Sequence, residues 1–417
     1  MKNTKAKAIF FFLLIWLANG AFGQSYRTFM DEWKQIVQTA RFSFGPFRIF
    51  PYLNFKNLGF DNNIFFEDHP VPDFSGTISP EVRVYWPLRE SLLLSFRENP
   101  EYVFYLNQKQ QRGFTNSYSF GLKYLLFHRI VFSADYLYGE HLQRVSSELG
   151  RPTTDAQREY SFGLFYETAR KTSIGITASV NRLSFKDIQT PDEAISLSQT
   201  LNRTERNANF EFYYQLFRDG YFFVKAGCTE FGFEQTSLER DSYSYQATGG
   251  LRFPMIGPLQ GTCSFGYVKI IPRGADKTGY SGFVSDAGID ARIRRLGIHL
   301  GYKRGFNFSY FEKAFIFVDN RLSGGISVYL TDFLRINYSY ELGYFNYPEA
   351  LNVPSAEGKA VEVGRNEKQG LHSGSLVLRV YKTIGLGVTF ISSRWTANVP
   401  GVDRNRSSIG AYLTYQF

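Results

Sequence analysis

Apolar and polar residues alternate along most of this chain with a period of two. In the final stretch, every second position is apolar or aromatic, namely Ile409, Ala411, Leu413, Tyr415 and Phe417. The positions between them are smaller or more polar. Successive side chains of a β-strand point to opposite faces, so this pattern predicts a strand with one apolar face.

The same alternation recurs from residue 46 to the end of the chain and predicts an all-β protein. Strand boundaries drawn from a sequence shift by several residues, so sixteen strands is the alternative to a count of eighteen. The eighteen predicted strands are 47–56, 74–86, 91–105, 113–127, 130–140, 157–168, 172–184, 204–216, 221–234, 240–253, 260–271, 279–293, 296–307, 313–330, 333–346, 369–381, 384–395 and 405–417.

The connections between these strands alternate in length. Bacterial outer-membrane barrels have short periplasmic turns and longer external loops, and an even strand number. We therefore predict a transmembrane antiparallel up-and-down β-barrel in a bacterial outer membrane, with both termini in the periplasm. The short connections are 87–90, 128–129, 170–171, 218–220, 294–295, 331–332 and 382–383, and the long ones are 57–73, 141–156, 185–203 and 347–368.

Residues 1–23 have the pattern of a secretory signal peptide. Lys2, Lys5 and Lys7 precede an apolar run that ends near Ala18, and small residues flank a predicted cleavage site after Gly23. That run is shorter than a comfortable membrane span. An exported chain without another long apolar run would enter a membrane as strands.

Residues 24–45 form a separate segment before the barrel, which we assign to 46–417. Within it, 26–41 has a helical period, with Phe29, Trp33 and Ile36 on one face. We expect this helix on the periplasmic side. Two roles stay open: it docks at or plugs the barrel mouth, or it is a short leader with no gating role.

Composition agrees with a barrel that exposes aromatic side chains to lipid. Phe, Tyr and Trp make up 18% of the chain, and aromatic girdles mark both interfaces of membrane barrels. The formal charge is +9, and removal of the signal peptide lowers it by three lysines to +6. No run of five like charges occurs, so a nucleic-acid partner is not expected.

The predicted inward faces carry charges of both signs, which we take as candidate pore-lining residues. A cation facing the middle of the lipid would cost roughly 2–4 kcal/mol, whereas a wet lumen removes most of that cost. Such charges could select solutes, or they could simply pair within a filled lumen. The candidates are Glu81, Arg83, Arg97, Glu101, Lys123, Asp135, Asp286, Asp290, Arg292, Lys303, Asp319, Arg321, Arg335, Glu341 and Arg379.

Enzymatic, metal and cofactor sites are not predicted. None of the five histidines is spaced from another as a metal pair, and no G-x-S-x-G sequence occurs. Cys228 and Cys263 fall on strands separated by a third strand, and strands two apart lie about 9.5 Å from each other. A disulfide needs Cα atoms within about 7 Å, so we predict two unpaired cysteines.

Several stretches resemble the β-barrel porin 2 family. They are FRIFPYLNFKNLGFDNNIFF at 47–66, PEVRVYWPLRESLLLSFRENPEYVFY at 80–105, LNRTERNANFEFYYQLFRDGYFF at 201–223, YSGFVSDAGIDARIRR at 280–295 and SVYLTDFLRINYSYELG at 327–343. The resemblance implies an outer-membrane barrel, and some members of that family are associated with exopolysaccharide export. Resemblance to outer-membrane barrels also implies that the last strand, with Tyr415 and Phe417, is the signal read by the barrel-assembly machinery.

The sequence therefore favours an outer-membrane porin or channel that passes a solute or polymer, with exopolysaccharide export as one such role. The alternative is a non-conducting barrel that serves as a surface scaffold or binding protein. The expected partners are outer-membrane lipid, the barrel-assembly machinery, and polysaccharide or small hydrophilic solutes. No cofactor is expected.

Overall fold

The computed structural model covers the barrel and the helix that precedes it. The predicted signal peptide and the terminal Phe417 lie outside the described residues. The structure describes residues 28–66, 69–143, 153–168, 172–189, 194–217, 220–236, 239–256, 258–274, 279–309, 315–354, 360–381, 383–398 and 403–416.

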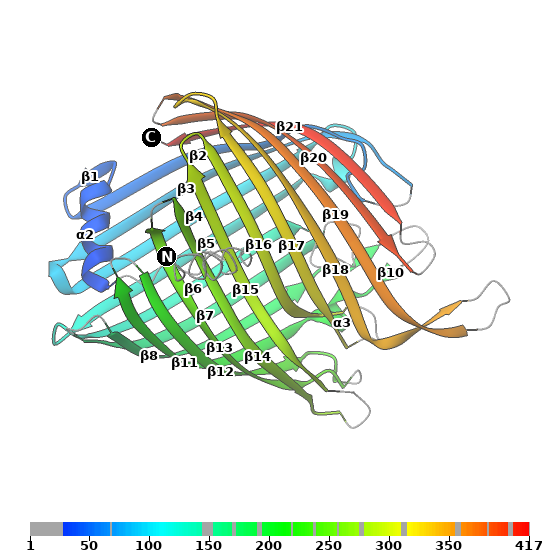
Figure 1. Ribbon diagram of the computed structural model, residues 1–417, viewed down its shortest axis with the longest axis horizontal. Helices are drawn as coiled ribbons and strands as arrows, with labels where there is room; N and C mark the ends of the chain where they lie inside the picture. The colour runs from blue at the N-terminus through cyan, green and yellow to red at the C-terminus, as the bar shows by residue number, and fades with distance from the viewer. Residues whose placement is uncertain are drawn as a thin grey trace, which may run out of the picture.

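Eighteen antiparallel strands form one closed barrel (Figure 1). Each strand pairs with its neighbours in the chain, and β2 closes the barrel by pairing with both β3 and β21. The strands are β2 (Phe47–Asp61), β3 (Asp73–Leu88), β4 (Leu92–Tyr105), β5 (Gly113–Leu126), β6 (Ile130–Gln143), β7 (Thr153–Glu167), β8 (Thr172–Phe185), β11 (Arg203–Phe217), β12 (Gly220–Phe233), β13 (Ser242–Ile256), β14 (Leu259–Pro272), β15 (Tyr280–Ile293), β16 (Leu296–Phe308), β17 (Ile316–Tyr329), β18 (Leu334–Pro354), β19 (Ala360–Tyr381), β20 (Ile384–Ala397) and β21 (Arg404–Gln416).

The predicted asymmetry between the two ends of the barrel is confirmed. Short turns, the helix α2 (Phe29–Thr39) and the end of β21 all lie at one end, which we call the turn end (Figure 1). At the tight turn after β5, Phe127 and His128 both have positive φ, the conformation of a type I′ hairpin turn. The opposite end carries the longer connections, and we call it the loop end.

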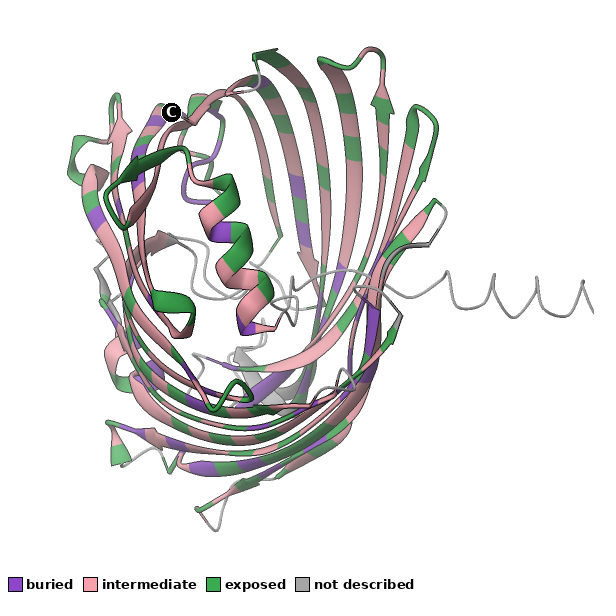
Figure 2. Ribbon diagram, turned by 90° about the vertical axis from the view of Figure 1, so that its left-hand side faces the viewer, coloured by how far each residue is buried: buried purple, intermediate pink, exposed green. Residues whose placement is uncertain are grey.

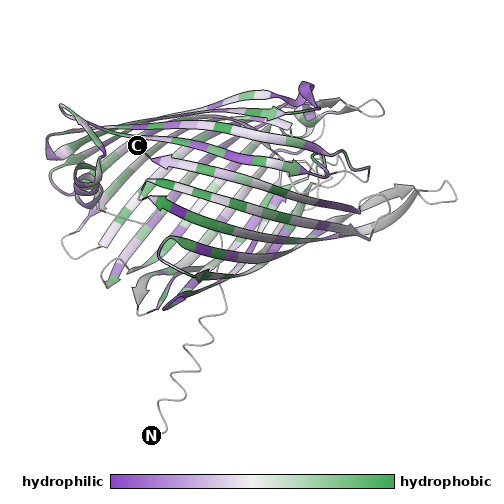
Figure 3. Cartoon of the chain, turned by 90° about the horizontal axis from the view of Figure 1, so that it is seen from above, coloured by the Kyte–Doolittle hydropathy of each residue, from purple (hydrophilic) through white to green (hydrophobic). Residues whose placement is uncertain are grey.

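Hydrophobic and hydrophilic residues alternate along the strands (Figure 3). Successive side chains of a strand point to opposite faces, so one face of the wall is more apolar than the other. On β8, Ile174, Ile176 and Val180 are exposed on the outer face. On the alternate positions, Ser173 is buried and Thr177 lies against a cavity inside the barrel. In a transmembrane barrel only every second residue meets lipid, so such a barrel needs no long apolar run. Within the described residues, no helix is long and apolar enough to cross a membrane.

Three sequence boundaries need correction. The expected helix 26–41 is shorter as described, beginning at Phe29 and ending at Thr39. The connection predicted at 57–73 is shorter than expected, because β2 continues to Asp61 by pairing with β3 and β21. The predicted loop 347–368 is mostly strand: β18 and β19 keep pairing from Ala350↔Gly364 to Pro354↔Ala360 beyond a bulge. The polar composition of these residues predicted a loop, but their backbones continue the β18–β19 pairing.

Four short elements lie outside the barrel ladder or at its edge. Strand β1 (Phe42–Phe44) pairs with the start of β2 around the Gly45-Pro46 turn. The connection between β8 and β11 contains the paired strands β9 (Ile188–Gln189) and β10 (Ala194–Ile195), followed by helix α3 (Leu197–Leu201).

Candidate functional site in the barrel lumen

Helix α2 lies within the outline of the barrel at the turn end, against one part of its wall (Figure 2). Its first turn is capped by Thr28, whose Oγ1 accepts a hydrogen bond from the Asp31 N–H at 3.2 Å. Phe29 and Ile36 lie two helical turns apart on the predicted apolar face, and they are 2% and 8% exposed. The amphipathic helix therefore buries its apolar face inside the barrel.

The apolar face of α2 packs on the inner wall formed by β2 to β7. Phe29 and Ile36 form a buried cluster with Leu93, Leu125 and Val131. Aromatic side chains from the neighbouring strands pack at its edges, including Tyr85 and Phe165. The helix is therefore docked on the wall, and its role in gating stays a prediction.

Two polar contacts fix the orientation of α2. The Lys123 Nζ lies 2.6 Å from Glu32 Oε2, and the Phe29 N–H donates a hydrogen bond to Glu167 Oε1 at 3.2 Å. The predicted lumen residue Lys123 therefore joins the wall to the helix. The Glu167 contact satisfies one backbone donor that a helix N-terminus leaves without an intrahelical partner.

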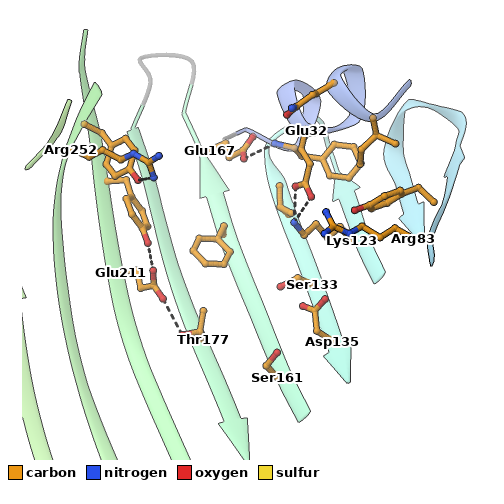
Figure 4. Close-up of a pocket in the computed structure, with 18 of the residues that line it drawn as sticks. Glu32, Arg83, Lys123, Ser133, Asp135, Ser161, Glu167, Thr177, Glu211 and Arg252 are labelled. Carbon is orange, nitrogen blue, oxygen red and sulfur yellow. Dashed lines mark hydrogen bonds and ion pairs between the residues drawn. The ribbon is translucent and has the colours of Figure 1, made fainter. Parts of the chain in front are cut away.

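A cavity of about 870 Å³ remains beside α2. One side is α2, where Glu32 and Gln35 line it, and the opposite side is the wall of β11 to β13. Glu211, Lys225 and Arg252 come from that wall, and Figure 4 shows Glu211 and Arg252 facing this space. The helix thus narrows the turn end, and a space lined by both charged and aromatic side chains remains beside it.

Several predicted lumen charges pair along the wall. Glu81 accepts from Arg83 Nε at 2.5 Å and from Arg97 Nε at 2.9 Å. Glu101 pairs with Lys56, which was not among the candidates, at 2.5 Å. These contacts join side chains of β2, β3 and β4, and they agree with the expectation that some lumen charges neutralise one another.

A second set of candidates lies on β17 and β18. Arg321 Nε donates to Asp319 Oδ1 at 3.0 Å, and Arg321 Nη1 donates to Glu341 Oε1 at 2.9 Å. The guanidinium carbons of Arg292, on β15, and Arg335, on β18, lie 4.3 and 5.7 Å from the centroid of the Tyr329 ring. Cationic groups near an aromatic ring gain electrostatic stabilisation.

The remaining candidates are more dispersed. Asp135 faces the cavity beside α2 (Figure 4). Asp290 Oδ1 lies 2.6 Å from His299 Nδ1, and Asp286 is directly opposite Lys303 in the β15–β16 register. Arg379 is exposed near the turn that leads to β20. The fifteen candidates therefore do not form one ring, and their pore-lining role stays a prediction.

The loop end is narrowed by side chains that the sequence did not predict as lumen residues. Phe66, from the connection after β2, packs edge to face on Trp395, and Trp395 stacks on Phe345 with centroids 4.9 Å apart. Phe317 and Tyr347 complete this buried cluster. Because these residues come from β17, β18 and β20, the first loop is anchored to strands from the C-terminal part of the chain, across the junction of β2 and β21.

A second inward connection carries α3. Leu197 and Leu201 of this helix are buried with Phe231, Val268 and Phe308 of the inner wall. Arg240 is fully buried, and its Nη1 donates to the backbone oxygens of Thr200 and Ser309 at 3.1 and 2.6 Å. This arginine ties three connections together at the loop end.

Sequence reasoning missed two kinds of residue here. Glu211 and Lys225, whose charged groups are 3.1 Å apart, follow the inward alternation and could have been added by the same rule. Arg240 lies in a connection, where no periodicity signals an inward direction. Its role follows only from how the connections fold over the barrel.

No metal or disulfide chemistry is evident among the described residues. No group of three or more His, Cys, Asp or Glu side chains there could hold a metal ion. Cys228 on β12 is exposed and Cys263 on β14 is buried, and both are free thiols.

The comparisons with known proteins concern the fold. No family model matches the chain, and no curated protein matches it. Among solved structures, OpdK of Pseudomonas aeruginosa with vanillate has a TM-score of 0.50 at 11% identity, covering 88% of this chain and 98% of that one. OccK2 (OpdF) of the same organism has a TM-score of 0.51 at 11% identity, covering 88% and 97%.

OccK2 in complex with glucuronate gives the same TM-score of 0.51 at 10% identity, covering 88% of this chain and 98% of that chain. These identities are too low to transfer a substrate. The resemblance to the β-barrel porin 2 family has no support from the family comparison. The chain has the fold of an 18-stranded outer-membrane porin.

Proposed function

We propose that the protein is an outer-membrane channel for small hydrophilic solutes, with α2 as a partial plug at the periplasmic end. The observation that carries this proposal is the cavity of about 870 Å³ between α2 and the wall of β11 to β13, which is lined by charged, polar and aromatic side chains. Barrels of this strand number are wide enough for an aqueous channel unless internal segments fill them. Here α2 fills part of the lumen and leaves space beside it.

Small solutes fit this geometry better than a polymer. The inward loop that carries Phe66 and the connection that carries α3 narrow one end, and α2 narrows the other. A polysaccharide would have to pass all three while extended. The exopolysaccharide role implied by the family resemblance therefore requires displacement of α2, and it ranks second in our proposal.

The structures of OpdK with vanillate and OccK2 with glucuronate give two small carboxylates as probes. Their use here rests on a shared fold alone. The wall opposite α2 supplies Lys225 and Arg252, although Lys225 pairs with Glu211. Ion selectivity therefore has to be measured and does not follow from the count of positive charges.

Orientation follows from the same proposal. The turn end would face the periplasm, as short turns do in outer-membrane barrels, and the loop end would face the exterior. The N-terminal helix and the end of β21 would then both be periplasmic. Protease accessibility of the loop end in intact cells tests this placement.

The test of the proposed function is single-channel conductance of the refolded mature protein in a planar bilayer. The full-length mature chain is compared with a chain lacking residues 24–45. Stable conductance of the full-length protein supports an open channel beside α2, and larger conductance after truncation supports the partial plug. Two verified folded barrels that both fail to conduct would refute the channel and favour a surface scaffold.

A further inference from the structure

A groove of about 590 Å³ lies on the outer wall of the barrel, across β18 to β21. Its lining includes Lys368, His372, Arg394 and Asn405. Lys368, His372 and Arg394 are all exposed, whereas Glu367 and Trp395, which alternate with them, are 1% and 2% exposed inside the barrel. These three side chains therefore point away from the lumen.

The strand register brings these groups together. Gly370 is opposite Arg394, and Arg394 is opposite Asn405. His372, on the same face of β19, is opposite Ser392. Gly370 leaves the position between Lys368 and His372 without a side chain, which opens the floor of the groove.

The groove lies at one edge of the apolar band. Strands rise about 3.3 Å per residue and tilt by about 45°, so a 25 Å apolar band takes roughly 11 residues. Arg394 is ten residues from Ile384 at the turn end, and Asn405 is eleven from Gln416. Nearer the turn end, the same outer face carries exposed Val388 and Phe390. The groove is thus at the level of lipid headgroups.

Two outward cations at the same level on other strands have carboxylate partners. Arg182 pairs with Glu234 at 2.8 Å, and Arg206 pairs with Glu230 at 3.0 Å. Among the described residues, neither Lys368 nor Arg394 forms an ion pair with a carboxylate. A third cation of the lining, Arg406, pairs with Asp61. Lys368 and Arg394, two cations at headgroup level without acidic partners, are complementary to an anion there.

Neutral donors accompany the two cations. The groove also includes the hydroxyl groups of Tyr340, Ser392 and Ser407. Ser407 Oγ donates to Ser392 Oγ at 3.3 Å, and the Tyr338 hydroxyl lies 2.8 Å from His372 Nδ1 beside it. Hydroxyl and cationic donors around one hollow match the several acceptor oxygens of a phosphate group.

We propose that this groove binds a phosphate group of a phosphorylated glycolipid in the outer leaflet, with Lys368 and Arg394 as the charged ligands. The proposal rests on the proposed placement of the barrel in an outer membrane with its loop end outside. Acyl chains of the same lipid would then lie on the exposed apolar residues below the groove. Attachment to lipid at this position would fix the depth of the barrel beside β18 to β21.

The test is native mass spectrometry of the full mature barrel in detergent, titrated with bisphosphorylated lipid A. The same glycolipid without phosphates and inorganic phosphate are titrated separately. Lys368→Gln combined with Arg394→Gln should weaken lipid A binding by about tenfold or more, because two charge-assisted contacts are lost. Arg182→Gln is the matched control and should leave binding within about twofold, since that arginine already has a carboxylate partner.

Gly370→Val provides a second variant that keeps both cations. An added Cβ at Gly370 would lie 3.3 Å from the Tyr340 hydroxyl, so a larger side chain fills the hollow. We expect weaker binding from this variant as well. Retention of the folded barrel is checked for every variant by its mobility shift on gels between unheated and heated samples.

Three results would overturn the proposal: equal lipid A binding by the double variant, equal binding of the dephosphorylated lipid, or inorganic phosphate that competes with lipid A at equal concentration. The last would mean a general anion site without a lipid preference. Conductance does not enter this measurement. A barrel that binds lipid A and never conducts would refute the channel alone, and a conducting barrel without phosphate-dependent binding would refute the groove alone.

Discussion

Truncation of Phe29 to alanine should release α2 from the barrel wall. Phe29 is 2% exposed and sits in the cluster with Leu93, Leu125 and Val131. Replacing a buried phenylalanine by alanine typically costs 3–5 kcal/mol. Because α2 borders an open cavity on its other side, we use the lower value, about 3 kcal/mol. Each 1.4 kcal/mol is a factor of ten, so the docked helix should lose about 100-fold in population relative to the released one.

The ion pair of α2 should contribute much less. The side chains of Glu32 and Lys123 are 32% and 33% exposed, so water screens their attraction. Partly exposed pairs are worth about 0–1 kcal/mol, which corresponds to a change of at most about fivefold. Lys123→Gln therefore separates the apolar contribution to docking from the electrostatic one.

Hydrogen exchange of the α2 amides measures both effects. Their exchange should accelerate by about 100-fold in Phe29→Ala and by at most about fivefold in Lys123→Gln, while the strand amides keep their protection. Phe120→Ala is the control, because Phe120 is 51% exposed on the outer wall of β5. Unchanged α2 protection in Phe29→Ala would refute the docking energetics, and parallel loss of strand protection would show that the helix is not a separate unit.

Three further perturbations test other parts of the barrel. Glu81→Gln leaves the arginines that it contacts without this carboxylate, and the reversal potential in a KCl gradient should shift toward anion selectivity; a shift toward cations would contradict the assignment to the lumen. Ile176→Arg should lower the free energy of unfolding, measured in vesicles, by about 2–4 kcal/mol because position 176 faces lipid. Position 177 faces the lumen near Glu211, so Thr177→Arg should change that free energy by less than about 1 kcal/mol. Trp395→Ala removes the ring that stacks on Phe345, and we expect a loss of about 3 kcal/mol in urea unfolding together with faster proteolysis of the connection that carries Phe66.

The sequence was sufficient to predict the barrel ladder because lipid and water impose opposite demands on successive residues of every strand. On β8, for example, Ile176 and Thr177 differ in polarity for that reason alone. The strand ends were less predictable. The polar residues around 347–368 continue a hairpin, since backbone pairing in water needs no apolar face.

The contents of the lumen were predicted only in part. Alternation placed Lys123 and Glu81 on inward faces. It could not show that Lys123 forms an ion pair with Glu32 of the helix, or that Glu81 pairs with two arginines. The Lys123 contact depends on which part of the wall the inserted helix meets. The Glu81 contacts depend on the register of β3 and β4 and on the side-chain conformations of the two arginines. Arg240 lies in a connection, where a sequence pattern says nothing of direction, and its burial follows from the packing of three loops.

The position of α2 also has a consequence for the order of assembly. The helix contacts β2 to β7, and its bond to Glu167 spans 138 positions of the chain. The seam between β2 and β21 joins residues far more distant in sequence, with Tyr52 and Gln416 separated by 364 positions. Loops of greater length close at a higher entropic cost. We therefore expect α2 to settle on a still-open half-barrel, so that closure of the seam encloses a helix already in place and no folded helix has to enter through the finished mouth.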